Sequence, residues 1–231
     1  MGPVLFILYT QPLSDIIQSH SVSHHVYADD TELYKSSSPE NVSPLLTSVQ
    51  RCAQDVKEWT LRNKLQLNED KTEALLIDPS SISTEPPSSI TVGDNDIPFS
   101  DSARNLGVMF DNSLSMNVQI NKLCQAGYLE LRRISSIRHY LTREATATLV
   151  SSLVLSRLDY ANSLLAGLPQ KCTDKLQRVM NCAARLIYRS SKRDHITPLL
   201  SELYWLPISK NSVQNRSYLF QYNIKHCPSI P

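Results

Sequence analysis

The stretch that decides the fold of the N-terminal half is Val22-Ser23-His24-His25-Val26-Tyr27-Ala28-Asp29-Asp30-Thr31-Glu32-Leu33-Tyr34. Two β-prone arms flank a pair of adjacent carboxylates, and the alternation of apolar and polar residues in the first arm predicts a β-hairpin. Asp29 and Asp30 lie between the arms, at a position where the tightest hairpin turns favour glycine. Two carboxylates there repel each other, and a bound divalent cation would offset that repulsion because hard cations prefer oxygen ligands.

Helical and extended segments alternate around this hairpin. The apolar run from Val4 to Tyr9, with Pro3 in its first turn, predicts a helix at the start of the chain. Apolar residues at helical spacing predict a longer helix from about residue 44 to residue 63. Strands are predicted for residues 65–67, 72–77, 90–92, 97–99 and 105–111, the last as one buried strand ending in a turn.

The two halves of the chain carry opposite charge. Residues 1–114 contain 7 Lys/Arg and 16 Asp/Glu, a net charge of −9, whereas residues 115–231 contain 16 and 6, a net charge of +10. This asymmetry favours two different tasks and makes the basic half a candidate for nucleic-acid binding. The alternative is two solvated surfaces of opposite sign that attract each other.

Cysteine usage and hydropathy bear on the compartment. The five cysteines are scattered, odd in number and without a Cys-x-x-Cys pair, which supports neither a zinc knuckle nor a disulfide framework. A reduced environment fits this pattern best. The apolar run at residues 4–9 is too short to span a bilayer. We therefore predict an intracellular protein, in the nucleus or the cytoplasm, without a membrane partner.

The basic half has the pattern of consecutive helices. A long helix is predicted from about Thr173 to Ser190, with an apolar face and a basic stripe beside it. The basic residues that we single out in this half are Lys175, Arg178, Arg185 and Arg189 of that stripe, and Arg132 and Arg133 with Arg138 and His139 near the end of an earlier helix. Phosphate contact is one interpretation of the stripe, and an ordinary solvated amphipathic helix is the other.

Several segments resemble a known family. Tyr27-Ala28-Asp29-Asp30 resembles the catalytic hairpin of reverse transcriptases, and the wider stretch to Tyr34 resembles the version found in non-LTR (LINE-type) retrotransposons. Gly2-Pro3-Val4-Leu5-Phe6, the segment from Asn63 to Glu73, and the segments around Asp159 and Trp205 also resemble that family, in family order. The segment 105–111 is similar to the family's primer grip, with a plain core strand as the alternative.

The resemblance implies an α+β fold. Residues 1–114 would form a partial polymerase palm, with an antiparallel sheet and helices, and residues 115–231 an all-helical thumb and C-terminal region. The expected activity is RNA-templated DNA synthesis, with an RNA template, a DNA primer and dNTP as partners. Asp29 and Asp30 would be catalytic ligands of Mg²⁺ or Mn²⁺, which such a reaction uses to stabilise the nucleophile and the leaving group. Tyr27 would contact nucleic acid.

Two further expectations concern the catalytic residues. Lys71 corresponds to a family lysine near the triphosphate and would act as a general acid, although an ordinary exposed turn lysine is the alternative. The family pattern also requires a third aspartate on an earlier strand, and only Asp15, in a helix-like stretch, precedes Asp29. We therefore expect a C-terminal fragment that is inactive alone. The alternatives are a non-catalytic nucleic-acid-binding remnant and a decayed transposon reading frame.

Overall fold

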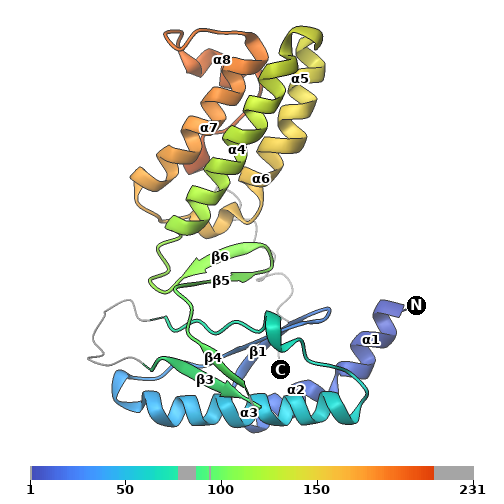
Figure 1. Ribbon diagram of the computed structural model, residues 1–231. Coiled ribbons are helices and arrows are strands. Elements are labelled where there is room, and N and C mark those ends of the chain that lie inside the picture. The colour runs from blue at the N-terminus through green and yellow to red at the C-terminus, as the bar shows by residue number, and fades with distance from the viewer. Residues whose placement is uncertain (1, 78–86, 94, 211–231) are drawn as a thin grey trace, which may run out of the picture. The chain divides into compact units, whose positions relative to one another are not determined.

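The computed structural model describes residues 2–77, 87–93 and 95–210. The chain divides into two compact units, Met1–Ala103 and Arg104–Pro231. The sequence-based boundary after residue 114 stays a prediction, and residues 211–231 of the predicted helical half lie outside the described residues. The fold is α+β, as the sequence predicted, because small two-stranded sheets in the first half are followed by a long helical region (Figure 1).

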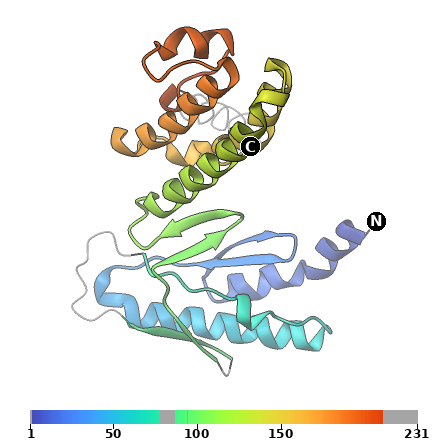
Figure 2. The ribbon, with the colours of Figure 1, turned by 45° about the horizontal axis from the view of Figure 1, so that its top comes forward.

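The residues of the first unit that the structure describes form three α-helices and two antiparallel hairpins. Its elements in chain order are α1 (Gly2–Thr10), α2 (Pro12–Ser19), β1 (Ser23–Tyr27), β2 (Asp30–Tyr34), η1 (Pro39–Asn41), α3 (Val42–Arg62), η2 (Glu69–Lys71), β3 (Ser89–Val92) and β4 (Asn95–Pro98). The predicted helices at residues 4–9 and 44–63 are therefore confirmed, as are the predicted hairpin around residues 22–34 and the predicted strands at 90–92 and 97–99, which pair with each other. Figure 2 shows the β1–β2 hairpin lying against α2.

The strands predicted at residues 65–67 and 72–77 do not form, apart from an isolated bridge between Ala74 and Phe99. The reason at the first segment is the end of α3. Lys64 adopts a positive φ of 59°, and the Leu65 amide donates to the Thr60 carbonyl at 2.8 Å. This left-handed cap uses the backbone donor that a strand would need for its ladder.

The described part of the first unit has two clusters of buried apolar residues, and one of them joins α2 and α3 to the residue before β1. Leu13 and Ile17 of α2 pack with Val22 and with Cys52 and Val56 of α3. All five are buried. Their burial stabilises the unit through the hydrophobic effect, by about 25 cal/mol for each Å² of apolar surface removed from water. Val22 immediately precedes β1, so this cluster anchors the base of the hairpin.

The second unit is mainly helical. Its elements are β6 (Val108–Asp111), α4 (Asn117–Ile137), η3 (Arg138–Tyr140), α5 (Arg143–Val150), a π-helical turn (Ser151–Leu155), α6 (Ser156–Asp159), a 3₁₀ turn (Asn162–Leu165), α7 (Gln170–Tyr188) and α8 (Ile196–Glu202). β6 pairs with β5 (Ser102–Asn105), which spans the boundary of the two units. The predicted helix at residues 173–190 is confirmed as α7.

The prediction of one strand over residues 105–111 is wrong, because the chain turns at Leu106 and Gly107. Both residues have positive φ angles, 43° and 86°. The backbone twist of a two-residue turn with positive φ at both central positions matches the twist of the strands that it joins. Glycine adopts a positive φ easily and so favours such a turn. The Tyr160 hydroxyl donates to the Leu106 carbonyl at 2.6 Å and so ties this turn to the helices.

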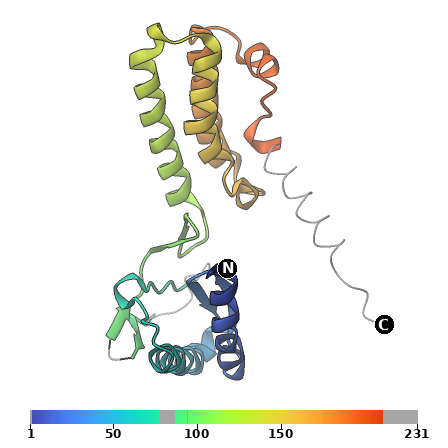
Figure 3. The ribbon, with the colours of Figure 1, turned by 90° about the vertical axis from the view of Figure 1, so that its right-hand side faces the viewer.

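The helices of the second unit pack side by side around a continuous core (Figure 3). α4 and α7 approach closely at Gly127, where an added Cβ atom would lie 2.7 Å from Val179 Cγ1. Thr142 caps α5, since its hydroxyl accepts the Ala145 amide at 3.1 Å, as the sequence predicts for a threonine before a helix. None of the described helices is both long enough and apolar enough to cross a membrane.

Candidate metal and nucleic-acid sites

The turn of the β1–β2 hairpin lies one residue earlier than the sequence predicted. Tyr27 pairs with Asp30, so the two turn residues are Ala28 and Asp29, and Asp30 is the first residue of β2. Ala28 has a φ of 54°, in the left-handed region that costs a residue with a Cβ atom roughly 1–2 kcal/mol. The two carboxylates therefore have different backbone settings, one at the tip and one on the strand.

Both carboxylates are exposed to solvent, as is Tyr27 at 68%. Their exposure leaves them accessible to a cation. In the part of the chain that the structure describes, however, no group of three or more His, Cys, Asp or Glu side chains comes together. Asp15 lies on α2 and is also exposed. Two carboxylates do not complete the coordination of a two-metal centre, so the described residues do not fit such a centre by themselves.

The base of the hairpin is fixed to α3 by polar contacts as well as by the apolar cluster. The Lys35 ammonium, directly after β2, donates to Ser48 Oγ at 2.7 Å and to the His20 carbonyl at 3.3 Å. Ser48 Oγ donates to the same carbonyl at 3.1 Å. Along the strands, the His25 and Tyr34 rings stack with centroids 5.3 Å apart. These contacts order the arms while the carboxylate tip stays solvated.

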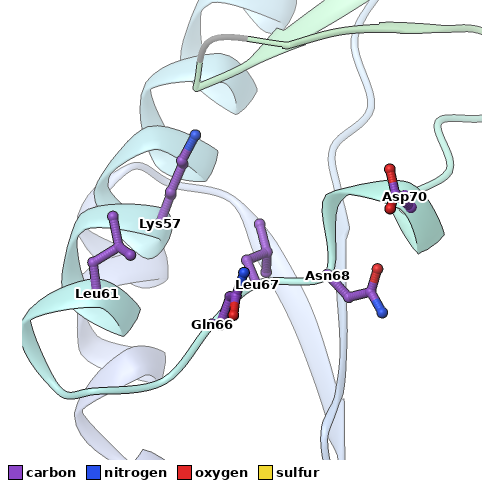
Figure 4. Close-up of a pocket in the computed structure, with 6 residues that line it drawn as sticks. All are labelled: Lys57, Leu61, Gln66, Leu67, Asn68 and Asp70. Atoms are coloured by element: carbon purple, nitrogen blue, oxygen red, sulfur yellow. The ribbon is translucent and has the colours of Figure 1, made fainter.

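Lys71 ends η2 and is exposed. Its amide donates to the Asn68 carbonyl at 3.2 Å. Within the described residues, no hydrogen bond or ion pair joins its side chain to the hairpin. The neighbouring Asp70 lines an open hollow of about 500 Å³ together with Lys57, Leu61, Gln66, Leu67 and Asn68 (Figure 4). The structure thus gives Lys71 the setting of a surface turn and leaves its predicted role a prediction.

The basic stripe of α7 faces α4 along one edge. Lys175 donates to Asn121 Oδ1 of α4 at 2.9 Å, and one turn later Arg178 is exposed beside Tyr128 of α4. Burial and the nearby Cys182 and Cys124 raise the pKa of the Tyr128 hydroxyl, although Arg178 opposes them. Arg132 continues the exposed edge on α4. Lys175, Arg178 and Arg132 therefore lie on one acid-poor face of the two helices, the α4–α7 face.

Other predicted cations have structural partners. Arg185 donates to the Ser191 carbonyl at 3.2 Å and to the Asp194 carbonyl at 3.4 Å, which fixes the loop after α7. Arg133 pairs with Glu130 at 3.2 Å, and Glu130 also meets Arg157 at 3.4 Å. Arg133 thus lies on a different face of α4 from Arg132. Arg189 is exposed, and its guanidinium donates to the Arg138 carbonyl at 3.1 Å.

Arg138 is the residue that the sequence interpretation placed least well. It is only 9% exposed, and its guanidinium donates to the carbonyls of Leu186, Ile187 and Leu141 at 3.0, 2.7 and 2.8 Å. Burial, followed by the neighbouring Arg189, lowers the pKa of Arg138. It therefore joins the C-terminal ends of α4 and α7. The sequence around Arg138 does not indicate this buried role, because the two α7 carbonyls that it binds lie nearly fifty positions away in the chain.

A comparison with family models gives one match. Residues 1–110 match the reverse transcriptase (RNA-dependent DNA polymerase) family. The matched reverse-transcriptase-like region includes the whole β1–β2 hairpin with Tyr27, Asp29 and Asp30, as well as Lys71, and it ends within β6. The helices from α4 onward, including the basic face, lie outside it. Comparison with curated proteins and with solved structures gave no match.

Proposed function

We propose that this chain is a C-terminal part of the RNA-directed DNA polymerase of a non-LTR (LINE-type) retrotransposon. The observation that carries the proposal is the reverse-transcriptase-like match of residues 1–110 across a hairpin with two adjacent, solvent-exposed carboxylates, Asp29 in its turn and Asp30 at the start of β2. The segments after residue 114 that resemble the same family support the LINE-type assignment. Such an enzyme acts inside the cell on an RNA template, a DNA primer and dNTP.

The proposed roles follow from the resemblance of these residues to the family's motifs. Asp29 and Asp30 are carboxylate ligands of Mg²⁺ or Mn²⁺, an ion that supplies charge neutralisation for phosphoryl transfer. Lys71 protonates the leaving pyrophosphate, and Tyr27 contacts nucleic acid. In this proposal the chain does not polymerise DNA by itself, because the family pattern requires a third aspartate that Asp29 and Asp30 do not supply. It requires a further aspartate on another segment.

Primer extension tests this proposal. We expect the chain, with Mg²⁺ or Mn²⁺, dNTP and a primed RNA template, to incorporate no more nucleotide than the Asp29→Asn/Asp30→Asn variant. Addition of a separate polypeptide that carries the remaining palm of such an enzyme should restore incorporation, and only with intact Asp29 and Asp30. Incorporation by the chain alone above the double variant would contradict the proposed inactivity. A reconstituted activity that ignores both aspartates would contradict their roles.

A second function, nucleic-acid binding without catalysis, is favoured by the exposed cations on the α4–α7 face. Arg132 and Arg178 are exposed there, and in the described part of the chain neither forms an ion pair. Phosphate contacts release counterions, so each contact steepens the dependence of affinity on salt by about one unit of the log–log slope. We expect micromolar binding of an RNA–DNA hybrid at low salt. Such binding would distinguish this function from a decayed transposon reading frame that has no function.

The matched variants for this test come from the structure. Arg178→Ala/Arg132→Ala should weaken binding and reduce the salt slope by about two. Arg133→Ala is the control, because its guanidinium is paired with Glu130 on another face. Arg185→Ala is unsuitable, since Arg185 holds the loop after α7. An equal loss in the control, or no binding by the unmodified chain, would contradict the nucleic-acid function.

A further inference from the structure

The end of the helical unit at which both α4 and α7 terminate has a distinct surface, the α4–α7 end surface. It consists of His139, Tyr140, Arg189, Lys192 and Arg193, all of them exposed. Figure 1 shows α4 and α7 running side by side with their C-terminal ends at the same end of this unit. The surface lies beyond the α4–α7 face, at the C-terminal ends of the same two helices, and it combines two adjacent aromatic rings with three cations.

Two reciprocal contacts hold this surface together. The Arg138 guanidinium donates to the Leu186 and Ile187 carbonyls of α7, and the Arg189 guanidinium donates back to the Arg138 carbonyl at 3.1 Å. Tyr140 follows Arg138 by two residues in the 3₁₀ turn η3, a rise of about 4 Å. The backbone of Tyr140 is therefore fixed within a short distance of the Arg189 guanidinium, although the two residues are far apart in the sequence.

Tyr140 presents its ring to solvent. It is 81% exposed, and its ring centroid lies 3.8 Å from that of His139. The neighbouring ring restricts the rotamers of Tyr140, so less side-chain entropy is lost when a flat ligand covers it. An aromatic ring of this kind beside cations is the arrangement on which unpaired nucleic-acid bases stack.

The two chain segments that carry the rings and the cations have a positive net charge, although Glu202 of α8 pairs with Arg143 at 3.2 Å. Residues 132–144 and 185–195 together contain eight Lys/Arg and two acidic residues, a net charge of +6. Asp194, one of the two acids, is engaged locally and accepts the Ser190 hydroxyl at 2.6 Å and the Ser191 amide at 2.7 Å. The other, Glu144, lies 3.9 Å from Arg143. Neither acid forms an ion pair with Arg189, Lys192 or Arg193 among the described residues.

We propose that the α4–α7 end surface binds an unpaired stretch of nucleic acid, with a base stacked on Tyr140 and phosphates on Arg189, Lys192 and Arg193. This inference rests on the proposed nucleic-acid function of the helical unit and names the part of the ligand that each surface takes. The α4–α7 face contacts a duplex through phosphates alone. Bases inside a duplex are covered by their neighbours, so only an unpaired segment offers Tyr140 a free face.

Fluorescence anisotropy with two labelled ligands tests the inference on the full chain. One ligand is a blunt RNA–DNA hybrid, and the other is the same hybrid with a single-stranded tail of a few nucleotides. We expect the tail to tighten binding, and Tyr140→Ala to remove that gain, a loss of about 5- to 150-fold for one stacked base. Binding of the blunt hybrid should not change. Tyr140→Phe is the matched control, because it keeps the ring and should keep the gain.

The outcomes separate the two proposals. A chain that binds the blunt hybrid but gains nothing from the tail overturns the end-surface inference and leaves the duplex function intact. A Tyr140→Ala variant that loses affinity equally for both ligands also overturns it, because the ring then acts on the duplex or on the fold. A chain that binds neither ligand overturns both proposals.

Discussion

The replacement Arg138→Lys separates a structural role from a nucleic-acid role, because it keeps the positive charge and removes the planar fork. Arg138 donates to three carbonyls, those of Leu186, Leu141 and Ile187, over 2.7 to 3.0 Å. A single ammonium cannot reach acceptors on both sides of the turn in the way that a guanidinium does. At least two of these carbonyls, which are buried or part-buried, would lose their charged donor.

The expected loss can be bounded from these contacts. A hydrogen bond to a charged group contributes about 1.5–3 kcal/mol. The loss of two such bonds, partly replaced by bonds of the lysine ammonium, should lower the unfolding free energy by about 3 kcal/mol. Urea unfolding, followed by far-UV circular dichroism, measures this in the transition of the helical unit. Arg132→Lys is the matched control on α4, since Arg132 is exposed and should change the unfolding free energy by less than about 0.5 kcal/mol.

The same pair of variants can refute the reasoning. If Arg138→Lys unfolds with a free energy within about 0.5 kcal/mol of the unmodified chain, the three carbonyl contacts do not stabilise the unit as argued. If it also lowers the affinity for an RNA–DNA hybrid as much as Arg132→Ala does, Arg138 is a phosphate contact. A loss of stability with native-like affinity at low temperature would support the structural role.

Three further changes have expected outcomes. Gly127→Ala should lower the unfolding free energy of the helical unit by about 1–2 kcal/mol, because overpacking against the stiff, buried Val179 exceeds the gain in helix propensity of about 1 kcal/mol; a double-mutant cycle with Val179→Ala should show favourable coupling. Burial opposes ionisation of Asp111, but bonds from Ser113 and from Ser115 outweigh it and lower the pKa of the Asp111 carboxyl. Its stabilisation is therefore present above the unfolded pKa of about 3.9 and is lost as the pH falls through the lower folded value, so Asp111→Asn should destabilise at neutral pH and converge with the unmodified chain in acid unfolding curves. Ala28→Gly should raise the melting temperature of the first unit slightly, since glycine adopts the φ of 54° without the cost of a Cβ atom; a lower melting temperature would show that the strain is absent.

Much of the secondary structure was accessible from local patterns. The hairpin around Val22 to Tyr34 and the helix that became α7 were found because a period of two or of 3.6 residues is written in adjacent positions. The turn was placed one residue late, since Ala28 rather than Asp30 takes the positive φ. The segment at residues 105–111 was misassigned because the turn at Leu106 and Gly107 interrupts an otherwise apolar run.

By itself, the sequence determined where the paired carboxylates and the basic stripe lie, because residue type and spacing are enough to mark a carboxylate pair or one side of a helix. Only the tertiary structure decided what each charge does. Arg138 donates to α7 carbonyls, Arg133 is paired with Glu130, and Tyr140 stands exposed two residues after Arg138, whose carbonyl accepts a hydrogen bond from Arg189. The physical reason is that burial and hydrogen-bond partners are set by packing across α4 and α7, between residues some fifty positions apart, and no local period records that packing.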